Sequence, residues 1–286
     1  MTDIASAIAR DSRPIAIDVI ARNNRPPFIK AQGGTIHDEQ TARKHGFSGA
    51  LVSGIVVGGY AMPILLDVWG EEWARNGAFA IDFKRPVFGG KVLGIRYDFA
   101  EDQDGKTAAI SYGQDDVIVA AGRAGLPRKA AEVDASLLDG DVHPFPDAPI
   151  PATPESLAVG QALGSKPFTL SADTIQLMTN RLDLGPDAWV TSAIHPFVYL
   201  SISTMQQYGS LSFPTPGVQV SAGLQMLSAA AVGETVESVG RISQLYEKNG
   251  HQYFESEQLI RTLDRRPVAI VSNTVIYRKR GAEAGA

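Results

Sequence analysis

The 286-residue sequence predicts an α+β fold in which two antiparallel sheets each wrap around a long buried helix. The first observation is that residues 54–66 and 194–208 contain no Asp, Glu, Lys or Arg. Segments of this length without a polar face are typical of buried helices. The second is that apolar, partly alternating segments separated by turn residues follow each of them, as in antiparallel strands. Such a sheet buries an apolar helix only by curling around it.

The first half begins with a strand at 14–21 and a short polar helix at 38–44, which we expect to stop at Gly46. The buried helix starts at Gly54. It contains internal Gly and Pro at a cost of about 1 kcal/mol per Gly and more for Pro, so we expect a backbone or a ligand to approach it closely. Three strands follow, at 79–87, 92–99 and 107–121, with a hairpin turn at Asp104-Gly105.

Residues 127–167 contain many of the prolines and no sustained period, which predicts a linker. We therefore expect two domains, 1–127 and 167–286, joined by a linker at 128–166. The second domain repeats the element order of the first, with a strand at 168–178, a helix at 194–208, strands over 218–227, 236–246 and 253–277, and a turn at Asn249-Gly250.

The two halves share landmarks at a spacing of roughly 143 residues, which indicates duplication. A single unit of this kind leaves a sheet edge open, and two units in tandem can pair those edges. The matching landmarks are Gly54 with Pro196, Gly90 with Gly233, and Gly105 with Gly250.

The composition excludes several classes of function. It is 44% hydrophobic and 20% charged, as in soluble globular proteins, and the net charge of -5 argues against a nucleic-acid surface. The absence of Cys excludes a disulfide framework, a Cys nucleophile and thiolate metal sites. No signal-peptide pattern is present and the apolar segments lack basic flanks, so we expect a cytoplasmic protein without a membrane span.

The chemistry-bearing stretch is the adjacent pair His37-Asp38, the short helix after it, and the turn Gly46-Phe47-Ser48-Gly49 before the buried helix. It resembles the MaoC-like hydratase family, whose motif is Gly-Asp-x-Asn-Pro-x-His followed by a short helix and Gly-Phe-x-Gly. His37 and the turn match that motif, and the resemblance continues through residues 82–92. It implies a double hotdog fold. The sequence departs from the motif at Gly34 and Gln32, where the family has its Asn and its catalytic Asp.

The resemblance implies a hydro-lyase, without metal or other cofactor, that acts on a 3-hydroxyacyl or 2-enoyl thioester of CoA or a carrier protein. His37 is the candidate base. Asp38 either replaces the missing Asp or caps the short helix. Amides between Gly49 and Gly54 are expected to polarise the thioester carbonyl, and a homodimer of tandem units is expected. The expected substrate contacts are Gln32, Gly49, Ser53, Gly54, Tyr60 and His195.

Alternatives remain open at this point. His195, in Ile-His-Pro-Phe, is similar to the His-Phe-Pro of carrier-protein dehydratases, or it caps the second helix. Without the motif Asp, the scaffold is also compatible with isomerisation, cyclisation or a pericyclic step on a polyketide-like substrate. A third possibility is a non-catalytic acyl-binding protein. No metal-ligand spacing, phosphate loop, Gly-x-Ser-x-Gly elbow or dinucleotide fingerprint occurs.

Overall fold

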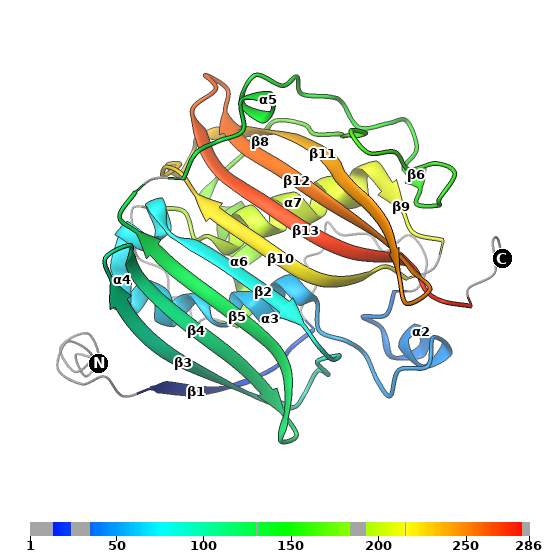
Figure 1. Cartoon of the computed structure of the whole chain (residues 1–286), viewed down its shortest axis with the longest axis horizontal. Helices are drawn as coiled ribbons and strands as arrows, with labels where there is room; N and C mark the ends of the chain where they lie inside the picture. Colours follow the sequence, from blue (N-terminus) through cyan, green and yellow to red (C-terminus); the bar gives the residue numbers. More distant parts are fainter. Residues whose placement is uncertain (1–13, 24–34, 130, 184–192, 215, 282–286) are drawn as a thin grey trace.

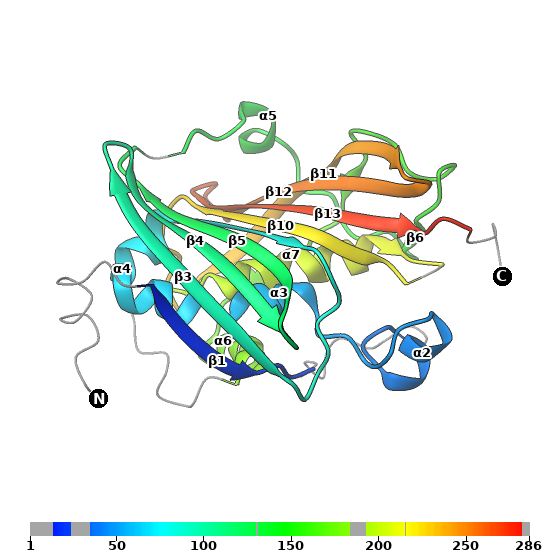
Figure 2. The ribbon, with the colours of Figure 1, turned by 60° about the horizontal axis from the view of Figure 1, so that its bottom comes forward.

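In the computed structural model, one curved antiparallel sheet of eleven strands covers the central helices (Figure 1). The structure describes residues 14–23, 35–129, 131–183, 193–214 and 216–281. Figure 2 shows α3, α6 and α7 together on the inner side of the sheet. None of the helices in the described part is both long and apolar enough to cross a membrane. The strand order is β1-β3-β4-β5-β2-β10-β13-β12-β11-β7, with β8 also paired to β11.

The first half has the predicted order of elements, with strands that alternate between buried and exposed side chains. Asp102, Asp104 and Gly105 form the expected hairpin turn, in which the Asp102 carboxylate accepts from the amides of the other two. The elements are β1 (Ile15–Ile20), α2 (Glu39–Lys44), α3 (Gly54–Gly59), α4 (Met62–Asn76), β2 (Ala78–Phe83), β3 (Val92–Asp102), β4 (Gly105–Gln114) and β5 (Val117–Pro127).

The predicted single buried helix is two helices, α3 and α4. Pro63 explains the break, because it has no N–H for the carbonyl of Gly59, four residues earlier, and its ring would clash with that carbonyl. A second interruption occurs inside α4 at Gly70, with φ 64° and ψ -158°. The prediction of an uninterrupted helix was therefore wrong, although α3 is as buried as expected.

The predicted strand at 107–121 is also two elements, β4 and β5, joined by a tight turn at Asp115-Asp116. Both residues have left-handed φ values, 52° and 61°, as a type I′ hairpin requires. Asp tolerates this conformation, but an Asp-Asp pair lacks the Gly that usually identifies such a turn in a sequence.

In the second half, the predicted strand at 168–178 was wrong except for its first two residues. From Ala172 onward the segment is helix α6, whose N-cap Ser171 accepts a hydrogen bond from the amide of Thr174. The elements are β8 (Phe168–Thr169), α6 (Ala172–Thr179), η1 (Asn180–Leu182), α7 (Phe197–Ser210), β9 (Leu211–Ser212), β10 (Val218–Met226), β11 (Thr235–Lys248), β12 (His251–Thr262) and β13 (Pro267–Arg278).

The two halves join along β2 and β10, which pair antiparallel from Ala78 to Asp82. The edge pairing expected from the sequence is thus present, and one hydrophobic core extends across both halves. The buried helices meet at Gly59, where an added Cβ would come within 2.8 Å of the Phe197 ring. Close approach of one helix to another is therefore the reason for this glycine.

The segment predicted as a linker packs against the second half of the sheet. It contains α5 (Ala135–Leu138), β6 (Ile150–Pro151) and β7 (Ala162–Leu163). Leu137 of α5 is buried with Val239 and Leu259 of the sheet, and α5 lies on the side of the sheet opposite α7 (Figure 2). Further along, Ser165 and Gly164 contact Gln206 and Ser210 of α7 on the inner side. We call residues 131–166 the strap, because they run from the outer face of the second half around its β11 edge to α7.

Candidate functional site

The segment that carries His37 is held between the two halves of the protein. Ile36 and Leu51 pack together in a small apolar cluster that also contains Val218 at the start of β10. Lys279, just after β13, lies 4.4 Å from the centre of the Phe47 ring. The motif that the sequence places in the first half is therefore completed by contacts from the second.

His37 is half-buried, and its Nδ1 lies 2.8 Å from the carbonyl oxygen of Leu51. A carbonyl oxygen can only accept a hydrogen bond, so Nδ1 carries the proton and Nε2 is the basic nitrogen of the neutral ring. The backbone carbonyl of His37 also accepts a hydrogen bond from the side-chain amide of Asn23. The Leu51 carbonyl thus fixes both the tautomer and the orientation of the ring.

Asp38 is the N-cap of α2. Its Oδ1 accepts from the amide of Thr41 at 2.7 Å, and its Oδ2 accepts from the amide of Thr35 at 2.9 Å. Both carboxylate oxygens therefore bind backbone amides. This geometry favours the capping role, one of the two alternatives left open by the sequence.

Between Gly49 and Gly54, most backbone amides are already used within the fold. Ala50 donates to Glu39, Leu51 to the carbonyl of Ile36, and Val52 to the carbonyl of Val87. The first amides of a helix have no partner within it, and among the described residues those of Gly54 and Ile55 donate to no backbone carbonyl. Ser53 occupies the N-cap position without a side-chain capping bond. The amides at the start of α3 are thus candidates to polarise a carbonyl, at the C-terminal end of the range that the sequence predicted.

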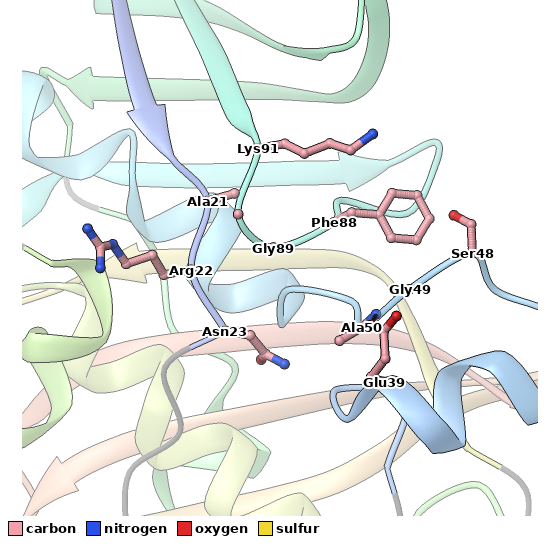
Figure 3. A pocket seen from close by; sticks show the side chains of 11 residues that line it. Ala21, Arg22, Asn23, Glu39, Ser48, Gly49, Ala50, Phe88, Gly89 and Lys91 are labelled. Carbon is pink, nitrogen blue, oxygen red and sulfur yellow. Dashed lines mark hydrogen bonds between the residues drawn. The ribbon is translucent and has the colours of Figure 1, made fainter.

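A cavity of about 640 Å³ opens beside this segment (Figure 3). Two of its walls come from the 48–50 backbone and from Phe88 to Lys91, with Glu39 of α2 nearby. Hydrogen bonds from the amide of Ala50 and from Arg43 lower the pKa of Glu39, so this carboxylate is ionised at neutral pH. The cavity is lined by Ala21, Arg22, Asn23, Glu39, Ser48, Gly49, Ala50, Phe88, Gly89, Gly90 and Lys91.

The cations at the cavity are engaged in ion pairs. Arg22 Nε lies 2.7 Å from a carboxylate oxygen of Asp183, and Lys91 pairs with Asp115. Figure 3 shows the side chains of Arg22 and Lys91 pointing away from one another. Both cations are therefore already paired with carboxylates of the protein.

Two predicted substrate contacts have structural roles in the described fold. The Tyr60 hydroxyl is buried and accepts a hydrogen bond from the amide of Arg22 at 2.9 Å, and burial raises the pKa of this hydroxyl. His195 is fully buried, and its Nδ1 accepts from the amide of Phe197 at the start of α7. Burial lowers the pKa of His195 to about 3, so the ring is neutral. Gln32 lies outside the described residues.

The second half contributes a residue that the sequence analysis did not select. Gln219 of β10 places Oε1 beside Gly54, where an added Cβ would lie 2.6 Å from it. Its Nε2 donates to Asn273 Oδ1 at 2.6 Å. The only signal in the sequence was a polar residue within an apolar strand, which is too common to identify a site.

No group of three or more His, Asp or Glu side chains able to hold a metal ion occurs among the described residues. No protein-family model matches the sequence, and no curated protein matches it.

The fold is shared with solved structures at low sequence identity. A MaoC domain protein from Chloroflexus aurantiacus J-10-fl superposes with a TM-score of 0.66 and 12% identity, over 95% of this chain and 96% of the other. A MaoC-like dehydratase superposes with a TM-score of 0.57 and 13% identity, over 85% of this chain and 88% of the other. A Mycobacterium tuberculosis protein described as having a double hotdog fold superposes with a TM-score of 0.52 and 14% identity, over 84% of this chain and 86% of the other. The chain therefore has the double hotdog fold that the sequence resemblance implied.

Proposed function

We propose that this protein is a hydro-lyase that interconverts a 2-enoyl thioester and a 3-hydroxyacyl thioester. The observation that carries the proposal is the orientation of His37, whose Nδ1 is fixed by the Leu51 carbonyl so that Nε2 is the basic nitrogen. The amides at the start of α3, three residues after Leu51, support it. The similarity in fold to a MaoC-like dehydratase agrees with it.

In the hydration direction, His37 Nε2 accepts a proton from a water molecule while the water oxygen bonds to C3 of the enoyl thioester. The C2–C3 double bond becomes single, and negative charge develops on the thioester oxygen. The amides of Gly54 and Ile55 stabilise this oxygen, and loss of one such donor costs about 3 to 4 kcal/mol in related chemistry. The imidazolium then returns the proton to C2, so that one water has been added.

A second candidate function is a scaffold that binds or rearranges a hydrophobic molecule without water. The capping role of Asp38 favours this alternative, because both of its carboxylate oxygens bind backbone amides. The site then has His37 as its one proposed proton carrier, without the carboxylate that the hydratase motif pairs with it. Under this alternative, His37→Ala leaves binding or turnover of the substrate largely intact.

The test is loss of the enoyl-thioester absorbance of crotonyl-CoA and of a longer 2-enoyl-CoA. We expect turnover by the native protein and a loss of roughly 100-fold or more in His37→Ala, as for removal of a general base. His45→Ala is the matched control, because His45 is an exposed histidine at the end of the same short helix. Absence of turnover on both substrates, or equal turnover in His37→Ala, would refute the proposal.

A further inference from the structure

Gln219 approaches the proposed site from the second half of the chain. A Cβ on Gly54 would lie 2.6 Å from Gln219 Oε1 and 2.9 Å from the ring of Phe83. Gly54, Phe83 and Gln219 are all partly exposed, so a small molecule can reach this position. The start of α3 is therefore bordered by a side chain that accepts hydrogen bonds.

The orientation of the Gln219 amide is fixed by buried neighbours. Gln219 Nε2 donates to Asn273 Oδ1, and Asn273 Nδ2 donates to Ser203 Oγ of α7 at 3.0 Å. Asn273 is only 3% exposed and Ser203 is fully buried. Burial of these polar groups is unfavourable unless they are bonded to each other, so the relay holds Gln219 in one orientation, with Oε1 toward Gly54.

The backbone of β10 is irregular at the same residue. The pairing of β10 with β13 shifts register between Gln219 and Ser221. A bulge of this kind turns a side chain out of the regular alternation of a strand and is frequent beside active sites. It explains why Gln219 can reach both Asn273 and the start of α3.

Gln219 and His37 contact opposite ends of one short segment, residues 51–54. His37 contacts the carbonyl of Leu51 and Gln219 lies beside Gly54, three residues later. An extended segment of this length spans about 10 Å between its end Cα atoms at most. The two side chains therefore contact the same four-residue segment, Leu51 to Gly54.

We propose that Gln219 Oε1 accepts a hydrogen bond from the 3-hydroxyl of a 3-hydroxyacyl thioester, and from the water that becomes this hydroxyl during hydration. The inference rests on the proposed function and adds a specificity determinant from the second half. An amide oxygen can only accept, and a hydroxyl or water can donate, so the chemistry of the pair is complementary. A saturated acyl thioester lacks this donor and leaves the amide oxygen without its partner.

The test is a binding measurement in the His37→Ala background, where turnover is blocked. Dissociation constants are measured by calorimetry for 3-hydroxybutyryl-CoA and butyryl-CoA. We expect the hydroxylated thioester to bind roughly three- to tenfold more tightly, as one net hydrogen bond provides. Adding Gln219→Met should remove this preference, whereas Gln219→Glu, which keeps an acceptor oxygen, should retain it.

Gln225→Met is the matched control, because Gln225 is a glutamine on the same strand that donates to backbone carbonyls near Gly77 instead. It should keep the preference. An unchanged preference in Gln219→Met would overturn the inference even if crotonyl-CoA is hydrated. Loss of the preference without hydration by the native protein would overturn the catalytic proposal and leave Gln219 as a specificity residue. Failure of both thioesters to bind would overturn the two together.

Discussion

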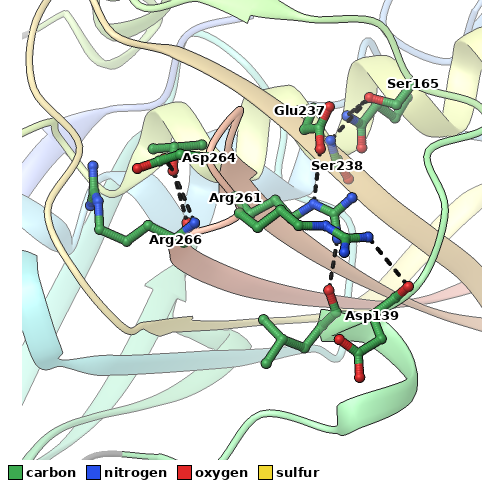
Figure 4. Close-up of polar contacts among 11 residues, drawn as sticks. Asp139, Ser165, Glu237, Ser238, Arg261, Asp264 and Arg266 are labelled. Atoms are coloured by element: carbon green, nitrogen blue, oxygen red, sulfur yellow. Dashed lines mark hydrogen bonds and ion pairs between the residues drawn. The ribbon is translucent and has the colours of Figure 1, made fainter.

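Replacement of Arg261 by Met should destabilise the protein and weaken the attachment of the end of α5 to the sheet. Figure 4 shows the Arg261 side chain between Glu237 of β11 and the end of α5. Its Nε donates to Glu237 Oε1 at 2.9 Å and its Nη1 donates to the carbonyl of Leu138 at 2.7 Å. The Arg261 side chain is 3% exposed and that of Glu237 is 17% exposed. Both partners of this ion pair are therefore largely removed from water.

The expected loss follows from this burial. Removal of one partner of a buried ion pair costs about 3 to 5 kcal/mol, because the other charge stays buried without compensation. Glu237 retains some contact with water, so we expect a value near the lower end, about 3 kcal/mol of unfolding free energy. The comparison is Arg241→Met. Arg241 also binds the strap, at Asp134 and Ser136. The Arg241 side chain is 32% exposed and that of Asp134 is 49% exposed, so water screens this ion pair.

Urea unfolding followed by circular dichroism measures both variants. Arg261→Met should lose far more stability than Arg241→Met, since exposed ion pairs contribute little. The double variant Arg261→Met with Glu237→Leu should recover much of the loss, because no charge is then left buried. Equal losses in the two single variants, or no recovery in the double variant, would refute the argument from burial.

Three further predictions concern the site and the core. Asp38→Ser keeps one N-cap oxygen for the amide of Thr41 and loses the bond to Thr35, so it should retain turnover and lose less unfolding free energy than Asp38→Ala, which should lose about 1 kcal/mol; loss of turnover in Asp38→Ser would show that the carboxylate acts in catalysis. Gly54→Ala gains about 1 kcal/mol in helix propensity, but overlap of the new methyl group with Gln219 and Phe83 costs about 1 to 3 kcal/mol. Stability and acyl-thioester affinity should therefore fall; an unchanged melting temperature and affinity would show that the methyl group fits without overlap. His195 has a folded-state pKa of about 3, below its unfolded value, so its neutral form stabilises the protein above pH 6.5 and this stability is lost as the pH falls. Between pH 7 and 5 the unfolding free energy of the native protein should fall by about 2 kcal/mol more than that of His195→Asn, because asparagine does not titrate. Equal falls, measured by urea unfolding, would show that His195 is not buried as a neutral ring.

Much of the fold is readable from the sequence because its signals are local. Burial of the helices follows from two uncharged segments, and Asn249-Gly250 identifies its hairpin because both residues adopt left-handed φ values readily. The errors are local as well. Pro63 divides the first helix, the Asp115-Asp116 turn lacks a glycine, and the cap at Ser171 was overlooked in a segment that reads equally well as a strand.

Local patterns in the sequence, together with the motif around His37, were enough to predict the double hotdog architecture, the pairing of two similar halves, and His37 as the candidate base. The contacts of the residues in and around this motif follow from the tertiary structure alone. The Leu51 carbonyl selects the His37 tautomer, the backbone amides occupy Asp38, and a register shift in β10 directs Gln219 toward Gly54. These relations join residues up to about 165 positions apart. No periodicity or turn signal records them, because they depend on how the two halves pack and not on local chain geometry.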